Sequence, residues 1–147
     1  MPPRMLSNQL SLARMEQPPW DGCLSSWDPE YRAYLKEQQL PHLAWSAGAR
    51  GYFVEPSGNG APLDWVVMLI WHSEANAERR ERARTLATER RVSPVAVSVA
   101  YALAQDFPSL ALVGPRSLDE LVASLPCLEL ELGPAELAWL DLRSDRR

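Results

Sequence analysis

The residue types that open one predicted helix could hold a phosphate. Gly114, Arg116 and Ser117 lie in the segment LALVGPRS at residues 110–117, where an apolar run passes through a glycine turn into a serine-capped helix. The N-terminus of a helix attracts anions, and a guanidinium presents a planar fork that matches phosphate oxygens. The pattern therefore predicts a phosphate site, with a plain strand-to-helix turn and a solvated arginine as the alternative.

Two further segments could hold a flat ring with polar edges. Trp45 and Ser46 lie in AWSAGARG at residues 44–51, directly after an apolar run. An aromatic floor with small neighbours suits a ring-shaped ligand, and a core tryptophan followed by a turn is the alternative. Asn8 and Gln9 place amides in another apolar stretch, where buried amides need hydrogen-bond partners. Solvation at the end of a strand is the alternative for these two.

Other kinds of chemistry have little support. His42 and His72 have no cysteine or carboxylate at metal-ligand spacing, so no metal site is predicted. Glutamates interleave the arginines of residues 79–91, which is typical of a solvated helical face. The sequence contains no Gly-x-Ser-x-Gly, Walker or Gly-x-Gly-x-x-Gly motif. No residue is therefore predicted to be catalytic.

Composition limits the classes of protein that the chain can represent. Its 147 residues carry a formal net charge of −4 and are 46% hydrophobic, which suits a single globular domain. The acidic balance argues against a nucleic-acid partner, and the apolar run 66–71 is too short to span a bilayer. Cys23 and Cys127 are read as reduced thiols, with one disulfide left open. No secretory signal is visible, so a cytoplasmic protein without a membrane partner is predicted.

Apolar spacing and capping residues predict the elements that position these groups. Strands are expected at residues 6–13, 40–45 and 110–113. Helices are expected from Asp28 onward and at residues 73–91, 95–105, 117–125 and 135–142. Residues 65–71 fit either a strand or a buried helix, residues 14–27 and 47–64 read as loops, and the helix at 95–105 is apolar nearly all round. The order of elements predicts an α/β protein with parallel strands.

At these segments the sequence resembles the aldo-keto reductase family. The similarity extends over residues 7–142 and is most specific in residues 40–53, 73–105 and 112–142. The resemblance implies that residues 1–147 are the C-terminal fragment of such a domain. The expected fold is α/β, a partial (β/α)₈ TIM barrel with three parallel strands and their surrounding helices.

The resemblance also implies roles for seven residues in binding NADP(H), with NAD still open. Gln9 matches a glutamine that holds the nicotinamide carboxamide, and Trp45 and Ser46 match an aromatic-serine pair that stacks the ring and touches the pyrophosphate. The turn that grips the adenosine phosphate corresponds to Gly114, Arg116 and Ser117. Ser124 stands where the family often has an asparagine that reaches the adenine.

This sequence departs from the family pattern at three points. The usual Pro-Leu after the aromatic-serine pair is Ala47-Gly48, and Glu120 stands where a basic residue or histidine often faces the phosphate. The catalytic Asp, Tyr, Lys and His of the family belong to the first four strands, to which nothing here corresponds. The predicted function is therefore the cofactor-binding portion of an NAD(P)H-dependent carbonyl reductase, an oxidoreductase part that is inactive alone.

Two alternatives remain at this point. The chain could be a nucleotide-binding or scaffold subunit that pairs with a second chain supplying the missing strands. Residues 83–105 also have helix-turn-helix spacing, but the second helix offers no Lys, Arg or Asn to read bases. Three strands cut from a barrel would leave two open edges. They would also leave inward-facing leucines without opposing strands, with Leu10, Leu12, Leu43, Leu110 and Leu112 as the candidates.

Overall fold

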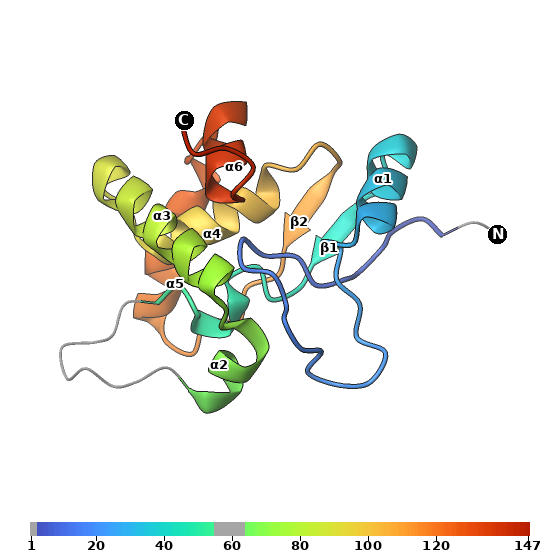
Figure 1. The fold of residues 1–147 in the computed structure, drawn as a ribbon, viewed down its shortest axis with the longest axis horizontal. Helices are drawn as coiled ribbons and strands as arrows, with labels where there is room; N and C mark the ends of the chain where they lie inside the picture. Colours follow the sequence, from blue (N-terminus) through green and yellow to red (C-terminus); the bar gives the residue numbers. More distant parts are fainter. Residues whose placement is uncertain (1–2, 55–63) are drawn as a thin grey trace.

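The computed structural model describes residues 3–54 and 64–147 as six α-helices, two short 3-10 helices and a two-stranded sheet (Figure 1). The helices are α1 (Pro29–Gln38), α2 (Trp65–Trp71), α3 (Glu74–Arg90), α4 (Pro94–Leu103), α5 (Leu118–Ser124) and α6 (Pro134–Leu140). The 3-10 helices are η1 (Ala49–Gly51) and η2 (Leu125–Leu128), and the strands are β1 (His42–Ala44) and β2 (Ser109–Ala111). Residues 55–63, the centre of the expected long loop, lie outside the described part.

The two strands pair in parallel, as the order of elements predicted. Leu43 lies opposite Leu110 and Ala44 opposite Ala111. A parallel pair needs a long crossover, and here α2, α3 and α4 provide it, so that β1 and β2 lie side by side in Figure 1 although they are far apart in the sequence. Both strands are shorter than the sequence predicted.

The expected first strand, at residues 6–13, is not a continuous strand. Leu6 makes a single parallel bridge to His42, and Gln9 makes single bridges to Trp45 on one side and Ser25 on the other. The next four residues are all fully buried, whereas a strand at a sheet edge alternates between a buried and an exposed face. The partial barrel with three strands is therefore reduced, in the described residues, to two strands and these isolated bridges.

Capping side chains fix where the helices begin. Asp28, Ser73, Ser93 and Ser117 each accept a hydrogen bond from a backbone N–H in the first turn of α1, α3, α4 and α5, as their positions predicted. The ambiguous segment at residues 65–71 is helix α2, capped by Asp64. The cap decides between the two structures that the apolar run allowed.

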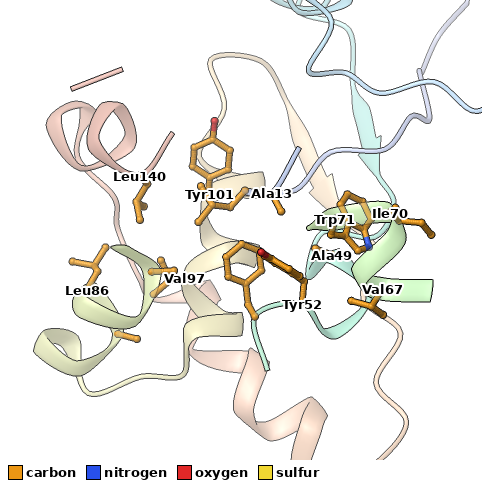
Figure 2. Close-up of a cluster of buried hydrophobic side chains, with 14 residues drawn as sticks. Ala13, Ala49, Tyr52, Val67, Ile70, Trp71, Leu86, Val97, Tyr101 and Leu140 are labelled. Atoms are coloured by element: carbon orange, nitrogen blue, oxygen red, sulfur yellow. The ribbon is translucent and has the colours of Figure 1, made fainter. Parts of the chain in front are cut away.

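Helix α4 forms the centre of the core. Its residues from Ala96 to Ala102 are all buried, which confirms the prediction from its apolar surface. Val97 and Tyr101 pack into a cluster with α2, α3 and α6, while Val99 and Ala102 pack into a second cluster with α1 and the sheet. In Figure 2, Tyr52 lies between Val97 on one side and the α2 side chains on the other.

The sheet leaves part of one face uncovered. Leu110 and Leu112 are 49% and 43% exposed, as expected for strands without opposing neighbours. Leu10 and Leu12 are fully buried, so the same expectation is wrong for them, because the chain from residue 10 to 13 folds into the two core clusters.

The structure also bears on the predicted arginine face at residues 79–91 and on membrane-spanning segments. Arg79 on α3 is 3% exposed, so the prediction of a solvated arginine face fails at this residue. Within residues 3–54 and 64–147, none of the helices has the length and apolarity needed to cross a membrane.

Candidate functional site

The carboxyl ends of β1 and β2 lie at the same edge of the sheet, together with Gln9. The backbone N–H of Leu112 donates to the carbonyl of Ala44 over 2.9 Å, which places the segment after β2 beside the segment after β1. Trp45 pairs with Gln9 through the single parallel bridge. In α/β sheets, ligands bind outside the carboxyl ends of the strands. The structure thus brings Gln9, Trp45 and the end of β2 to the edge where such a ligand would lie.

The carboxamide of Gln9 is buried and hydrogen-bonded within the protein. Its Nε2 donates to Ser11 Oγ over 2.9 Å, and its Oε1 accepts from Ser25 Oγ over 2.8 Å. An amide nitrogen has two donor hydrogens and its oxygen can accept twice. Gln9 therefore keeps one donor and one acceptor beyond these two bonds, which is the complement that a second carboxamide would use. The side chain is 0% exposed, so a ligand reaches it only when the chain that covers it moves.

Trp45 already has an aromatic neighbour. Trp20, from the loop before α1, stacks on it with ring centroids 5.1 Å apart and an interplanar angle of 23°. Trp20 is 56% exposed, so it covers Trp45 from the solvent side of the loop. One face of the predicted floor is thus occupied by a residue of the chain itself.

The backbone after Trp45 turns sharply. Ser46 has a φ of 54°, in the left-handed region that non-glycine residues rarely adopt, and its carbonyl accepts from Ala49 N–H over 2.8 Å. A side chain on Gly48 would meet Val95 Cγ2 at 3.2 Å. The Ala-Gly pair in place of the family's Pro-Leu therefore lets this turn lie directly against the first turn of α4.

The predicted phosphate clamp already contains a carboxylate. Ser117 Oγ accepts from the N–H of Glu120 over 3.1 Å, and Glu120 Oε2 accepts from the N–H of Arg116 over 2.7 Å. Arg116 Nη2 lies 3.5 Å from Glu120 Oε1, while the arginine side chain is 82% exposed. Glu120 therefore engages the group that was predicted to grip a phosphate.

Gly114 of the predicted clamp and Ser124, which was predicted to reach the adenine, are placed differently. Gly114 is exposed, and a side chain there would meet nothing within 4 Å. Ser124 is buried, and its hydroxyl donates to the carbonyl of Leu121 over 2.7 Å. The Ser124 hydroxyl is thus engaged by its own helix, whereas Gly114 leaves the approach to Arg116 open.

The tyrosines of the described residues lack the features of a tuned proton donor. Tyr31 and Tyr34 lie on α1, as predicted, away from the carboxyl ends of the strands. Burial raises the pKa of Tyr52 and of Tyr101, the opposite direction from a donor tuned toward neutral pH. Nor do the described residues include a cluster of three or more potential metal-binding side chains.

Sequence reasoning missed the residues that surround Gln9 and Trp45. Ser11 follows Gln9 by two residues, and its hydroxyl was not considered as a partner for the carboxamide. Trp20 and Ser25 belong to a loop that carried no motif, and they reach the site because this loop before α1 folds back over it. The one available signal was the tryptophan between Pro19 and Asp21, a large aromatic residue within a turn-rich loop.

A parallel sheet whose neighbouring strands are joined through helices defines the chain as an α/β protein. The model of the aldo/keto reductase family matches residues 22–142, and the chain belongs to that family. The matched range includes Trp45, Ser46, the turn at residues 114–117 and Ser124, while Gln9 precedes it. A comparison with curated protein sequences gives no match.

The fold is similar to that of a solved enzyme of the same family. This structure, a thermostable aldo-keto reductase in complex with the inhibitor epalrestat, aligns with a TM-score of 0.65 and 13% sequence identity. The alignment covers 95% of this chain and 39% of the other. The chain thus spans well under half the length of that enzyme.

Proposed function

We propose that the chain is the cofactor-binding portion of an NAD(P)H-dependent aldo-keto reductase and does not reduce carbonyl compounds by itself. The observation that carries the proposal is the pairing of Gln9 with Trp45 at the carboxyl edge of the sheet. The family membership of residues 22–142 supports a nicotinamide dinucleotide as the ligand, and NADP(H) is the form proposed.

The side chains at this edge fit the ligand in chemical type. Gln9 retains one donor and one acceptor for the nicotinamide carboxamide, Trp45 offers an aromatic surface, and the exposed Arg116 offers a guanidinium for a phosphate. Ser46, Gly114, Ser117 and Ser124 complete the proposed set, and the hydroxyl of Ser124 would have to leave the carbonyl of Leu121 to reach a ligand. A bound nicotinamide would supply the hydride, and these residues would hold and orient the nicotinamide ring.

The same proposal explains why turnover needs more than this chain. Among the described residues no tyrosine lies at the strand ends with a pKa lowered toward neutral. A proton donor within hydrogen-bond reach is required when a carbonyl accepts a hydride. In the complete enzyme, that donor and the remaining barrel strands would come from outside residues 1–147.

A second candidate function is a non-catalytic nucleotide-binding or scaffold subunit. The observation that favours it is the exposed apolar segment formed by β2 and the residues after it, where Leu110, Leu112 and Val113 are each more than 40% exposed. Apolar side chains on an open strand edge are suited to pairing with another chain. The partner would be a second chain that supplies barrel strands.

Titration of the purified chain with NADPH and NADH tests the proposal. We expect saturable binding that Trp45→Leu weakens, while Trp65→Leu, at a tryptophan 74% exposed on α2, leaves it unchanged. We also expect no oxidation of NADPH in the presence of an aldehyde. Equal binding by both variants would place the ligand elsewhere, and steady NADPH oxidation that a single substitution abolishes would contradict the non-catalytic part.

A further inference from the structure

Three arginines from distant parts of the chain surround one tryptophan. The guanidinium carbons of Arg14, Arg32 and Arg79 lie 4.2, 4.9 and 5.9 Å from the ring centroid of Trp27. Tyr101 stacks on the same ring at 5.8 Å, with an interplanar angle of 16°. One cation over an indole is a common stabilising contact. Three cations around one ring also repel one another, so their arrangement calls for a compensating charge.

The described residues do not provide that charge through an ion pair. In residues 3–54 and 64–147, no carboxylate oxygen lies within 4.0 Å of a nitrogen of these three arginine side chains. The charge of Arg14 is the second cause, after burial, that lowers the pKa of Arg79. Asp141 and Glu16 act on the pKa of Arg79 in the opposite direction, so the positive charges are offset only by carboxylates that form no ion pair with them.

The two acids that act on this cluster are engaged elsewhere. The carboxylate of Asp141 accepts from Arg143 Nε over 2.8 Å and from the hydroxyl of Tyr101 over 3.1 Å. Glu16 accepts from Ser73 Oγ over 2.6 Å and from Asn76 Nδ2 over 3.3 Å. Neither carboxylate forms an ion pair with the arginines around Trp27.

The cluster also retains hydrogen-bond donors without acceptors. Arg79 is 3% exposed, and its Nη1 and Nη2 donate to Asn76 Oδ1 and the carbonyl of Asp141, but its buried Nε has no partner. Arg32 Nη2 donates to Gln105 Oε1 over 2.8 Å and the side chain also interacts with the hydroxyl of Tyr101, while its Nη1 is buried without a partner. Buried donors are almost always satisfied.

Arg14 lies on the open side of the cluster. It is exposed, and apart from its contact with Trp27 its guanidinium makes no hydrogen bond or ion pair within the described ranges. All five N–H donors of this side chain are available. The cluster thus combines a solvent-accessible guanidinium with two buried ones that have unused donors.

We propose that Arg14, Arg32 and Arg79 form a binding site for a small oxyanion beside Trp27. The oxygens of a phosphate or carboxylate group accept several N–H bonds at once, and a guanidinium fork matches their geometry. Such an anion would balance the positive charges and accept the unused hydrogen bonds. The site uses none of the residues proposed to bind the dinucleotide.

Binding of inorganic phosphate to the full chain tests this site. Thermal unfolding is followed in phosphate, acetate and chloride at one pH and one ionic strength, and phosphate affinity is measured by calorimetry. We expect a saturable rise in melting temperature with phosphate or acetate beyond that with chloride. An effect of phosphate alone identifies a phosphate-type ligand, and an effect of both identifies the wider oxyanion class. No rise with either anion overturns the proposal.

Arginine variants locate the binding. Because Arg14 is exposed, Arg14→Gln should fold normally and lower phosphate affinity by about tenfold or more, the usual effect of losing a charge-assisted hydrogen bond. Arg4→Gln, at another exposed arginine, should leave the affinity unchanged. Equal losses in both variants would mean non-specific charge binding and overturn the site. Loss in Arg116→Gln instead of Arg14→Gln would assign phosphate to the dinucleotide site and also overturn it.

Discussion

The indole of Trp20 stacks on the indole of Trp45, with the ring centroids 5.1 Å apart. The loop before α1 thereby places an aromatic ring on the residue that is proposed to floor a nicotinamide. A ligand that uses this face of Trp45 must displace Trp20 and lose the contact between the two rings. Trp20 thus competes with the ligand for one surface.

Removal of Trp20 is therefore expected to tighten dinucleotide binding. A stacked aromatic pair contributes about 0.5–1.5 kcal/mol, so Trp20→Ala should raise NADPH affinity about two- to tenfold, as measured by titration calorimetry. Trp65→Ala, at an exposed tryptophan on α2, is the matched control and should have no effect. A loss of affinity in Trp20→Ala would show instead that Trp20 forms part of the ligand's floor.

Arg116 and Glu120 should have opposite effects on NADPH. Arg116→Ala is expected to weaken NADPH binding by about 1–3 kcal/mol, and NADH binding by less, because only NADPH carries the extra phosphate. Glu120→Arg should strengthen NADPH binding, since the carboxylate now engages Arg116.

Asp119→Asn removes a neighbouring negative charge that has no contact with Arg116 among the described residues, and it serves as the control for Glu120. Binding constants for both cofactors decide the outcome. Equal losses for NADPH and NADH in Arg116→Ala would place this arginine away from the phosphate, and an unchanged affinity in Glu120→Arg would mean that Glu120 faces away from the ligand.

The buried His42 should make the protein less stable in mild acid. Burial lowers the pKa of His42 from 6.5 to about 4, and its Nε2 lies 2.9 Å from Ser26 Oγ. Between these two pH values the unfolded chain binds a proton that the folded chain does not, so the free energy of unfolding falls as the pH falls from about 6.5 to about 4.

Urea unfolding at several pH values measures this contribution. His42→Gln, which keeps a nitrogen near Ser26, should show a smaller loss of stability across the window than the unmodified chain. His72→Gln, at an exposed histidine, should retain the full loss. The prediction fails if the curves for His42→Gln and the unmodified chain run parallel.

Truncation of a buried leucine should lower the free energy of unfolding more than truncation of an exposed one. Leu86 on α3 is fully buried in the cluster around α4, whereas Leu69 on α2 is 48% exposed. Leu86→Ala should lower the free energy of unfolding by about 2–5 kcal/mol, and Leu69→Ala by about 0.5 kcal/mol or less. Denaturant melts give both values, and similar losses would show that Leu86 does not pack as described.

The open strand should promote self-association of the isolated chain. Leu110 on β2 is 49% exposed, and an apolar strand edge pairs readily with another chain. Light scattering is expected to show oligomers, which Leu110→Lys reduces and Leu118→Lys, at a leucine 72% exposed on α5, does not. A sharp monomer peak with cooperative unfolding of the unmodified chain would contradict this prediction.

Local chemistry made the helices predictable. Asp28, Ser73, Ser93 and Ser117 each start a helix through a bond to a backbone N–H a few residues away, so the sequence alone contains both partners. The same holds for the apolar surface of α4, which required burial on every side. Parallel pairing of β1 with β2 followed from the order of the elements rather than from any one residue.

Contacts over long sequence distances were not predictable. The strand expected at residues 6–13 is broken because residues 10–13 pack on both sides into the core, which depends on where the following loop runs. The burial of Arg79 depends on Trp27 and on the carbonyl of Asp141, which belong to two segments far from α3 in the sequence. Helical periodicity indicates which residues of α3 share a face, and it gives no information about partners from other segments.

The separation of the two strands in the sequence determines when the sheet can form during synthesis. Helices α3 and α4 are neighbours in the chain and can pack as soon as residue 103 has left the ribosome. The edge of β1 must wait until residue 111 emerges, because Leu110 and Ala111 are its partners. Contacts between distant segments form slowly, and exposed strand edges promote aggregation. The nascent chain is therefore most exposed to misassociation while α2, α3 and α4 are being translated.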